Sequence, residues 1–174
     1  MSKSRDNLEQ DEKKILSELI KNSKENIDTI AKRCGFSRQK TWRFIKQLEA
    51  KRLIWGYTAI FDEQKIGLKH FVMMAKRNTG PLKEDTVTKI IKRDLDNMVK
   101  ELGITIESSL YVHGEYDWII AFTAKDIVYA KKLGDLLNEM HPGRLEKITI
   151  LQTMMTIKKQ YILNPERAKL KNFM

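Results

Sequence analysis

Basic side chains recur at helical spacing between Ser37 and Arg52, where Glu49 is the only acidic residue. A guanidinium fits guanine with two donors and a carboxamide fits adenine, and each pairing is worth roughly 1 to 3 kcal/mol of discrimination between bases. Gln39 and Arg43 are four positions apart, which places them on one face of a helix. This spacing predicts a surface that reads base edges in the major groove of double-stranded DNA.

Neighbouring side chains extend this predicted surface. Arg38 and Lys40 stand near the helix start, where we expect contacts with phosphates that add affinity without reading sequence. Trp42 lies off the apolar stripe, where it could stack on the DNA backbone or pack on a neighbouring chain. The predicted DNA-binding residues are Ser37, Arg38, Gln39, Lys40, Trp42, Arg43 and Lys46. A solvated basic face on an ordinary three-helix unit is the alternative.

Three short helices are expected to position these residues. Gly35 suits the left-handed residue that ends the second helix, and the Ser37 side chain can cap the first free amides of the third. The third helix has an apolar stripe at i, i+3, i+4 and i+7, made of Thr41, Phe44, Ile45 and Leu48. The arrangement of helix, tight turn and helix predicts a helix-turn-helix domain.

The rest of the chain alternates between strand and helix patterns. The residues 54–61, "IWGYTAIF", are rich in β-branched and aromatic side chains and predict a connecting strand. Further on we expect strands at 70–76, 108–112, 117–124 and 148–157 and helices at 86–102 and 127–140, with a tight turn at Gly114. This order, β-α-β-β-α-β, is the ferredoxin-like arrangement.

The predicted fold class is therefore α+β. A helix-turn-helix (winged-helix-like) domain occupies residues 1–61, a ferredoxin-like domain occupies 62–158, and 159–174 form a C-terminal tail with no assigned fold.

Composition restricts the function classes. A formal net charge of +10 favours an anionic partner, and the single cysteine, Cys34, leaves no intrachain disulfide, which predicts the cytoplasm. No apolar run approaches 18 residues, so we expect no membrane segment. The three histidines lack metal-ligand spacing, and neither a phosphate-binding loop nor a dinucleotide glycine motif is present. We therefore expect no metal, no cofactor and no enzymatic activity.

Three segments carry a family resemblance. The residues 8–60, from "LEQDEKK" to "IWGYTAI", resemble the N-terminal half of the Lrp/AsnC family of transcription regulators. The segments "YVHGEYDWIIAF" (111–122) and "HPGRLEKITI" (141–150) resemble its C-terminal domain, although Arg52 stands where the family commonly has glycine.

The resemblance implies a regulator that dimerises through its C-terminal sheets, often assembles into tetramers or octamers, and binds amino acids between dimers. Two alternatives stay open. One is a ligand-sensing oligomer that does not read DNA, and the other is an enzyme, because haem-pathway decarboxylases share this two-part architecture.

The resemblance also places an effector site. Gly114, Tyr116 and Asp117 match the family's turn beside its ligand pocket, and Thr149 is retained in the last strand. The Asp117 carboxylate could accept hydrogen bonds from a ligand ammonium, with backbone amides near Gly114 available to a carboxylate. The alternative is a purely structural turn, in which Gly114 supplies a positive φ and Asp117 caps the turn.

Overall fold

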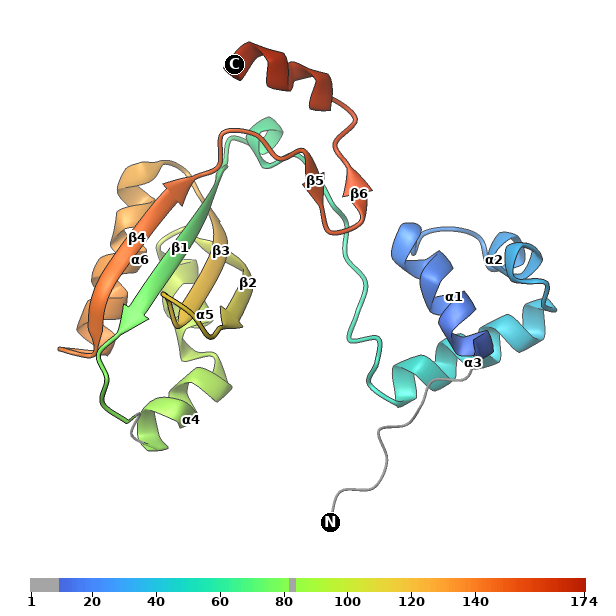
Figure 1. The fold of residues 1–174 in the computed structure, drawn as a ribbon, viewed down its shortest axis with the longest axis horizontal. Helices are drawn as coiled ribbons and strands as arrows, with labels where there is room; N and C mark the ends of the chain where they lie inside the picture. The colour runs from blue at the N-terminus through green and yellow to red at the C-terminus, as the bar shows by residue number, and fades with distance from the viewer. Residues whose placement is uncertain (1–9, 82–83) are drawn as a thin grey trace. The chain divides into compact units, whose positions relative to one another are not determined.

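A computed structural model describes residues 10–81 and 84–174 of the chain (Figure 1). The chain divides into two compact units. Among the described residues, the first contains 10–60 together with Ile157–Met174, and the second contains those of Phe61–Thr156.

Three α-helices form the N-terminal part of the first unit. They are α1 (Gln10–Lys21), α2 (Ile27–Cys34) and α3 (Arg38–Ala50). Gly35 ends α2 with a φ of 73°, and the Ser37 Oγ accepts a hydrogen bond from the amide of Lys40 at 3.2 Å, as the sequence predicts for both residues. The apolar faces of the helices meet in one core, formed by Ile15, Leu19, Ile30, Phe44, Ile45 and Leu48.

The strand predicted at 54–61 is not formed. The C-terminal end of α3 is capped by two backbone hydrogen bonds, from the amide of Arg52 to the carbonyl of Glu49 and from the amide of Leu53 to the carbonyl of Leu48. Arg52 has a φ of 56°. Beyond them, residues 55–60 make no backbone hydrogen bond with any residue that the structure describes. β propensity alone does not make a strand, because a strand requires a neighbouring strand to pair with, and the described part of the chain provides none here.

The second unit has the predicted β-α-β-β-α-β arrangement. Its strands are β1 (Lys69–Arg77), β2 (Thr105–Tyr111), β3 (Trp118–Ala124) and β4 (Leu145–Gln152), in the order β2-β3-β1-β4 with antiparallel pairing throughout. The helices α5 (Asp94–Glu101) and α6 (Ile127–Met140) cover one face of this sheet (Figure 1). The core between the layers centres on Phe71, Met73 and Phe122.

The single helix predicted at 86–102 is wrong. α4 (Glu84–Lys92) is separated from α5 by Arg93, which has a φ of 59° and binds Asp96 through two guanidinium nitrogens at 2.6 and 3.0 Å. α5 buries Leu95 and Val99 in the core, whereas α4 buries no residue among those described. α5 therefore packs on the sheet through buried side chains, whereas the side chains of α4 are more exposed.

The last strand is also shorter than predicted. β4 ends at Gln152, opposite Phe71, and one further bond joins the amide of Thr153 to the carbonyl of His70. The strand predicted to reach residue 157 ends earlier, because no further residue of β1 pairs with β4 beyond this point.

The C-terminal residues, to which the sequence analysis assigned no element, are structured. β5 (Lys158–Lys159) and β6 (Ile162–Leu163) form an antiparallel hairpin, and a 3-10 helix, η2, follows at Arg167–Phe173. Another short 3-10 helix, η1 (Glu63–Ile66), precedes β1.

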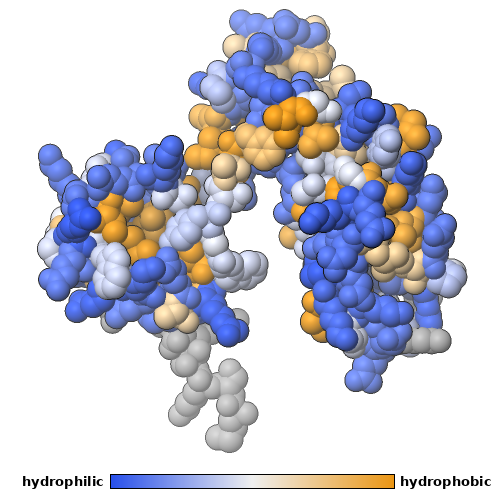
Figure 2. Space-filling model, turned by 180° about the vertical axis from the view of Figure 1, so that it is seen from behind, coloured by the Kyte–Doolittle hydropathy of each residue, from blue (hydrophilic) through white to orange (hydrophobic). Residues whose placement is uncertain are grey.

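Hydrophilic surface predominates on the side of the molecule drawn in Figure 2, interrupted by hydrophobic patches. Several large apolar side chains are exposed, and Trp55, between α3 and η1, is 95% exposed. In the described part of the chain, no helix has the length and apolar character needed to span a membrane.

Candidate nucleic-acid interface

One face of α3 is open to solvent. Gln39, Trp42, Arg43 and Lys46 are all exposed, and they recur at i, i+3, i+4 and i+7. The opposite stripe, beginning at the buried Thr41, packs on α1 and α2. Trp42 is 53% exposed and therefore belongs to the outward face together with the three polar side chains.

Arg43 is the least constrained cation of this face. It forms no ion pair with any described residue, and its guanidinium lies 5.5 Å from the centre of the Phe44 ring. The planar donors of Arg43 therefore remain available for a pair of acceptors outside the chain.

Lys46 is paired inside its own helix. Its Nζ lies 2.7 Å from Glu49 Oε2, and the Tyr57 hydroxyl donates to Glu49 Oε1 at 3.1 Å. The hydrogen bonds from Lys46 and then Tyr57 lower the pKa of the Glu49 carboxyl, so this group stays ionised near neutral pH. Lys46 must therefore leave Glu49, or share it, when it binds an external anion.

The residues at the start of α3 are engaged within the unit. Arg38 forms an exposed pair with Asp28 at 2.5 Å. Lys40 lies 2.7 Å from Asp11 and 4.2 Å from the centre of the Phe36 ring. The Ser37 cap and these contacts connect the start of α3 to α1 and α2, so all three predicted residues have partners inside the unit.

Asp117, at the β2–β3 turn, is bound to the neighbouring strand. Its Oδ2 accepts a hydrogen bond from the Arg77 amide at 2.8 Å, and its Oδ1 lies 3.5 Å from Arg77 Nε. Its own amide donates to the Ala75 carbonyl at 3.0 Å. These contacts join the start of β3 to the end of β1.

The other predicted effector residues divide into two groups. The hydroxyls of Tyr116 and Thr149 are 3.3 Å apart, and both residues are half-buried. Gly114 is exposed, does not have a positive φ, and a Cβ added to it would meet no atom within 4 Å. The part of the structural alternative in which Gly114 supplies a positive φ is therefore wrong, because the backbone turns here without that conformation.

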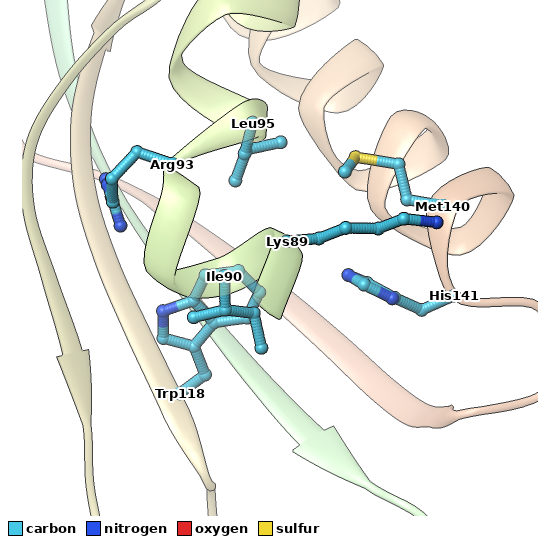
Figure 3. A pocket seen from close by; sticks show the side chains of 7 residues that line it. All are labelled: Lys89, Ile90, Arg93, Leu95, Trp118, Met140 and His141. Carbon is cyan, nitrogen blue, oxygen red and sulfur yellow. The ribbon is translucent and has the colours of Figure 1, made fainter. Parts of the chain in front are cut away.

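A small hollow lies where α4 and α5 meet the start of β3 and the end of α6 (Figure 3). Its lining comprises Lys89, Ile90, Arg93, Leu95, Trp118, Met140 and His141. Its volume of about 10 Å³ holds roughly one water.

The cations of this hollow already have partners. Lys89 pairs with Asp85 at 3.2 Å and Arg93 with Asp96, while burial, followed by the charge of Lys89, lowers the pKa of His141. We read the hollow as a packing gap. Among the described residues, no group of histidine, cysteine and carboxylate side chains could hold a metal ion.

The sequence reasoning did not find the partners of the predicted site residues. Glu49 follows Lys46 by three positions, a spacing that predicts their pair. Arg77 is 40 positions from Asp117, and Asp28 is on the helix before that of Arg38, so no spacing within one helix or strand predicts these pairs.

Comparisons with known proteins agree with this geometry. Residues 12–54 match the sequence model of the family described as winged helix-turn-helix DNA-binding. The chain is 25% identical to the proline dehydrogenase transcriptional activator of Rhodobacter capsulatus over 130 aligned residues. The alignment covers 74% of this chain and 80% of that protein. A protein of the same description from Rhizobium radiobacter is 23% identical over 136 residues, covering 78% and 83% respectively.

Solved structures give the same result for the whole fold. An AsnC family transcriptional regulator from Agrobacterium tumefaciens has a TM-score of 0.67 at 18% identity and covers 91% of this chain and 98% of its own. The chain has the fold of the Lrp/AsnC regulators. A transcriptional regulator from Neisseria meningitidis, solved as a complex with L-Met, shows this Lrp/AsnC fold with a TM-score of 0.64 at 17% identity, covering 91% and 97%.

The Lrp/AsnC resemblance stated from the sequence is confirmed at the level of the fold. The winged helix-turn-helix match and the transcriptional activators among the relatives support a DNA-binding transcription regulator. The exposed face of α3 lies inside the matched segment, whereas the residues of the β2–β3 turn lie outside it.

Proposed function

We propose that this protein recognises specific sequences in double-stranded DNA through the exposed face of α3, and that it acts by binding and not as an enzyme. The observation that carries the proposal is the outward orientation of Gln39, Trp42, Arg43 and Lys46, on one side of a helix whose other side is buried in its own unit. A helix with this division fits a major groove.

Each residue has a role in this proposal. Arg43 pairs with the two acceptors of guanine, and Gln39 pairs with adenine. Trp42 makes apolar contacts with the DNA, and Lys46 exchanges Glu49 for a phosphate. Ser37 fixes the helix start, while Arg38 and Lys40 add positive potential beside the phosphates.

The protein is further proposed to work in the cytoplasm as a homodimer that assembles into tetramers or octamers. One face of the sheet is covered by helices, but the side chains pointing the other way, including Val72, Met74 and Ile119, are only partly buried, and Leu151 is 50% exposed. A second copy would cover this apolar face. Two reading helices spaced about 34 to 36 Å apart would then meet successive major-groove segments.

A small effector of the amino-acid class is proposed to act at the β2–β3 turn and the adjacent part of β4, through Gly114, Tyr116, Asp117 and Thr149. Support comes from the paired hydroxyls of Tyr116 and Thr149 and from the structural neighbour solved with L-Met. Such an effector would regulate by binding one assembly more tightly than another, which shifts the equilibrium between them.

Arg43→Ala tests the reading face. A duplex from the protein's own upstream region, titrated in the presence of unrelated competitor, should bind the variant about 5- to 150-fold more weakly, which corresponds to the loss of roughly 1 to 3 kcal/mol. Arg43→Lys is the matched control, because it keeps the charge and loses the two-donor pairing. It should lose discrimination between duplexes while retaining most of the salt dependence. Unchanged affinity of both variants would rule out this face.

A further inference from the structure

The C-terminal hairpin has a tight tip. β5 and β6 pair Lys158 with Leu163 and Lys159 with Ile162, so that only two residues, Gln160 and Tyr161, form the turn. Gln160 has a φ of 50°, a conformation suited to a two-residue hairpin turn, and the amide of Asn164 donates to the carbonyl of Ile157 at 2.9 Å. The hairpin is thus a defined element.

A winged helix-turn-helix normally carries a hairpin, the wing, directly after its reading helix. The match to the winged family ends at Ile54, and residues 51–68 contain no strand. In the described part of the chain, the one two-stranded sheet is β5–β6, and it belongs to the same compact unit as α1, α2 and α3. The unit that contains the reading helix therefore has a hairpin, supplied by the other end of the chain.

This terminal segment has the charge expected of a DNA contact. Residues 158–174 contain five basic side chains, Lys158, Lys159, Arg167, Lys169 and Lys171, against the single acid Glu166. Lys158 is exposed on β5, and Tyr161 at the tip is 62% exposed. Cationic side chains and tyrosine hydroxyls are both common partners of phosphate oxygens.

We propose that the β5–β6 hairpin is the wing of this DNA-binding unit. In this proposal, Lys158 and Tyr161 contact the sugar-phosphate backbone of the duplex that α3 reads. The inference rests on the proposed DNA binding and adds a second contact surface to it. Because backbone contacts do not distinguish bases, the hairpin contributes affinity and salt dependence, and α3 contributes sequence preference.

The test compares Lys158→Gln with the unaltered full-length protein. Binding to a fluorescein-labelled mixed-sequence duplex of roughly 30 base pairs, about three helical turns, is followed by anisotropy at several salt concentrations. Loss of one phosphate contact should reduce the slope of log K against log salt by about 1. Lys158→Arg should restore the slope, because it keeps the cation.

The matched control is Lys131→Gln on α6, which removes the same charge from an exposed position in the other unit. Equal slopes for Lys158→Gln and Lys131→Gln would overturn the proposal, since the effect would then come from net charge alone. Tyr161→Phe should weaken binding without changing the slope, because it removes a neutral donor at the tip.

Failure of the wing and failure of DNA binding give different results. If the unaltered protein does not bind duplex, the proposed function fails and the wing fails with it. If the protein binds duplex and Arg43→Ala weakens it, but Lys158→Gln leaves affinity and slope unchanged, only the wing is overturned. A wing is supported when Lys158→Gln weakens all duplexes equally and Arg43→Ala changes their ranking.

Discussion

The exposed face of α3 and the β2–β3 turn both present polar side chains that resemble those of binding sites, but their partners differ. Arg43 on α3 has no ion pair among the described residues, whereas Asp117 at the turn is bound to Arg77 by a hydrogen bond of 2.8 Å and an ion pair of 3.5 Å. A polar group that is satisfied inside the chain mainly stabilises the fold. An unpaired group can bind a ligand without first breaking such a contact, so the two regions are expected to respond differently to substitution.

Asp117→Ala should have the largest effect on stability in this comparison. The variant loses a charge-assisted hydrogen bond that joins β3 to β1, and we expect about 1.5 to 2 kcal/mol of destabilisation in urea unfolding. DNA affinity should not change. Glu115→Ala is the control, because its side chain is 73% exposed. Unchanged stability would contradict this structural role, whereas loss of an amino-acid-dependent change in assembly would support the effector role proposed for Asp117.

Ser37→Ala, at the start of α3, should reduce stability less than Asp117→Ala does at the β2–β3 turn. Removal of the side-chain oxygen that caps α3 should cost about 1 kcal/mol in thermal or urea unfolding, while Ser37→Gly should cost only a few tenths. If Ser37→Ala weakened DNA binding strongly without changing stability, Ser37 would be a direct DNA contact and not a positioning residue.

Glu49→Gln should strengthen DNA binding by roughly two- to fivefold, because it releases Lys46 and removes a negative charge near the phosphates. The pKa of Glu49 is lowered, so its pair with Lys46 persists at neutral pH and is lost only as the pH falls through that lowered pKa. Affinity measured at and above neutral pH should therefore show no step from this group. An unchanged affinity in Glu49→Gln would mean that Lys46 does not contact DNA.

Gly114→Val should have the smallest effect, below about 0.5 kcal/mol, because the added side chain meets no atom and the backbone is not left-handed. Gly35→Val is the comparison, since Gly35 has a φ of 73° and a branched side chain there should cost about 1 to 2 kcal/mol. Equal destabilisation of the two variants in urea unfolding would contradict this difference.

Sequence reasoning found the elements whose signals are local. The predicted helix at 127–140 coincides with α6, whose start is capped by the Asp126 side chain. The N-cap at Ser37 and the left-handed Gly35 follow from residue type alone. The orientation of Gln39 and Arg43 toward solvent likewise follows from the helical period of the apolar stripe.

The features that were missed depend on distant contacts. The break at Arg93 has no glycine or proline to signal it, because a basic residue holds the left-handed conformation while binding Asp96. The pair between Lys40 and Asp11 links two helices that are far apart in sequence. The absence of a strand at 54–61 reflects a missing partner, which composition does not reveal.

Residues 55–60 lead from α3 toward the second unit, make no backbone hydrogen bonds with described residues and are joined to α3 by the bond from Tyr57 to Glu49. In the proposed dimer they would act as a tether. Fully extended, a run of this length spans at most about 20 Å. In a dimer, two reading units held by such tethers would share one small volume. Once the first unit occupied its half-site, the second would search for its own at an effective concentration in the millimolar range. Weak single contacts would then add up to tight binding, and lengthening the tether would reduce affinity without altering any residue that touches DNA.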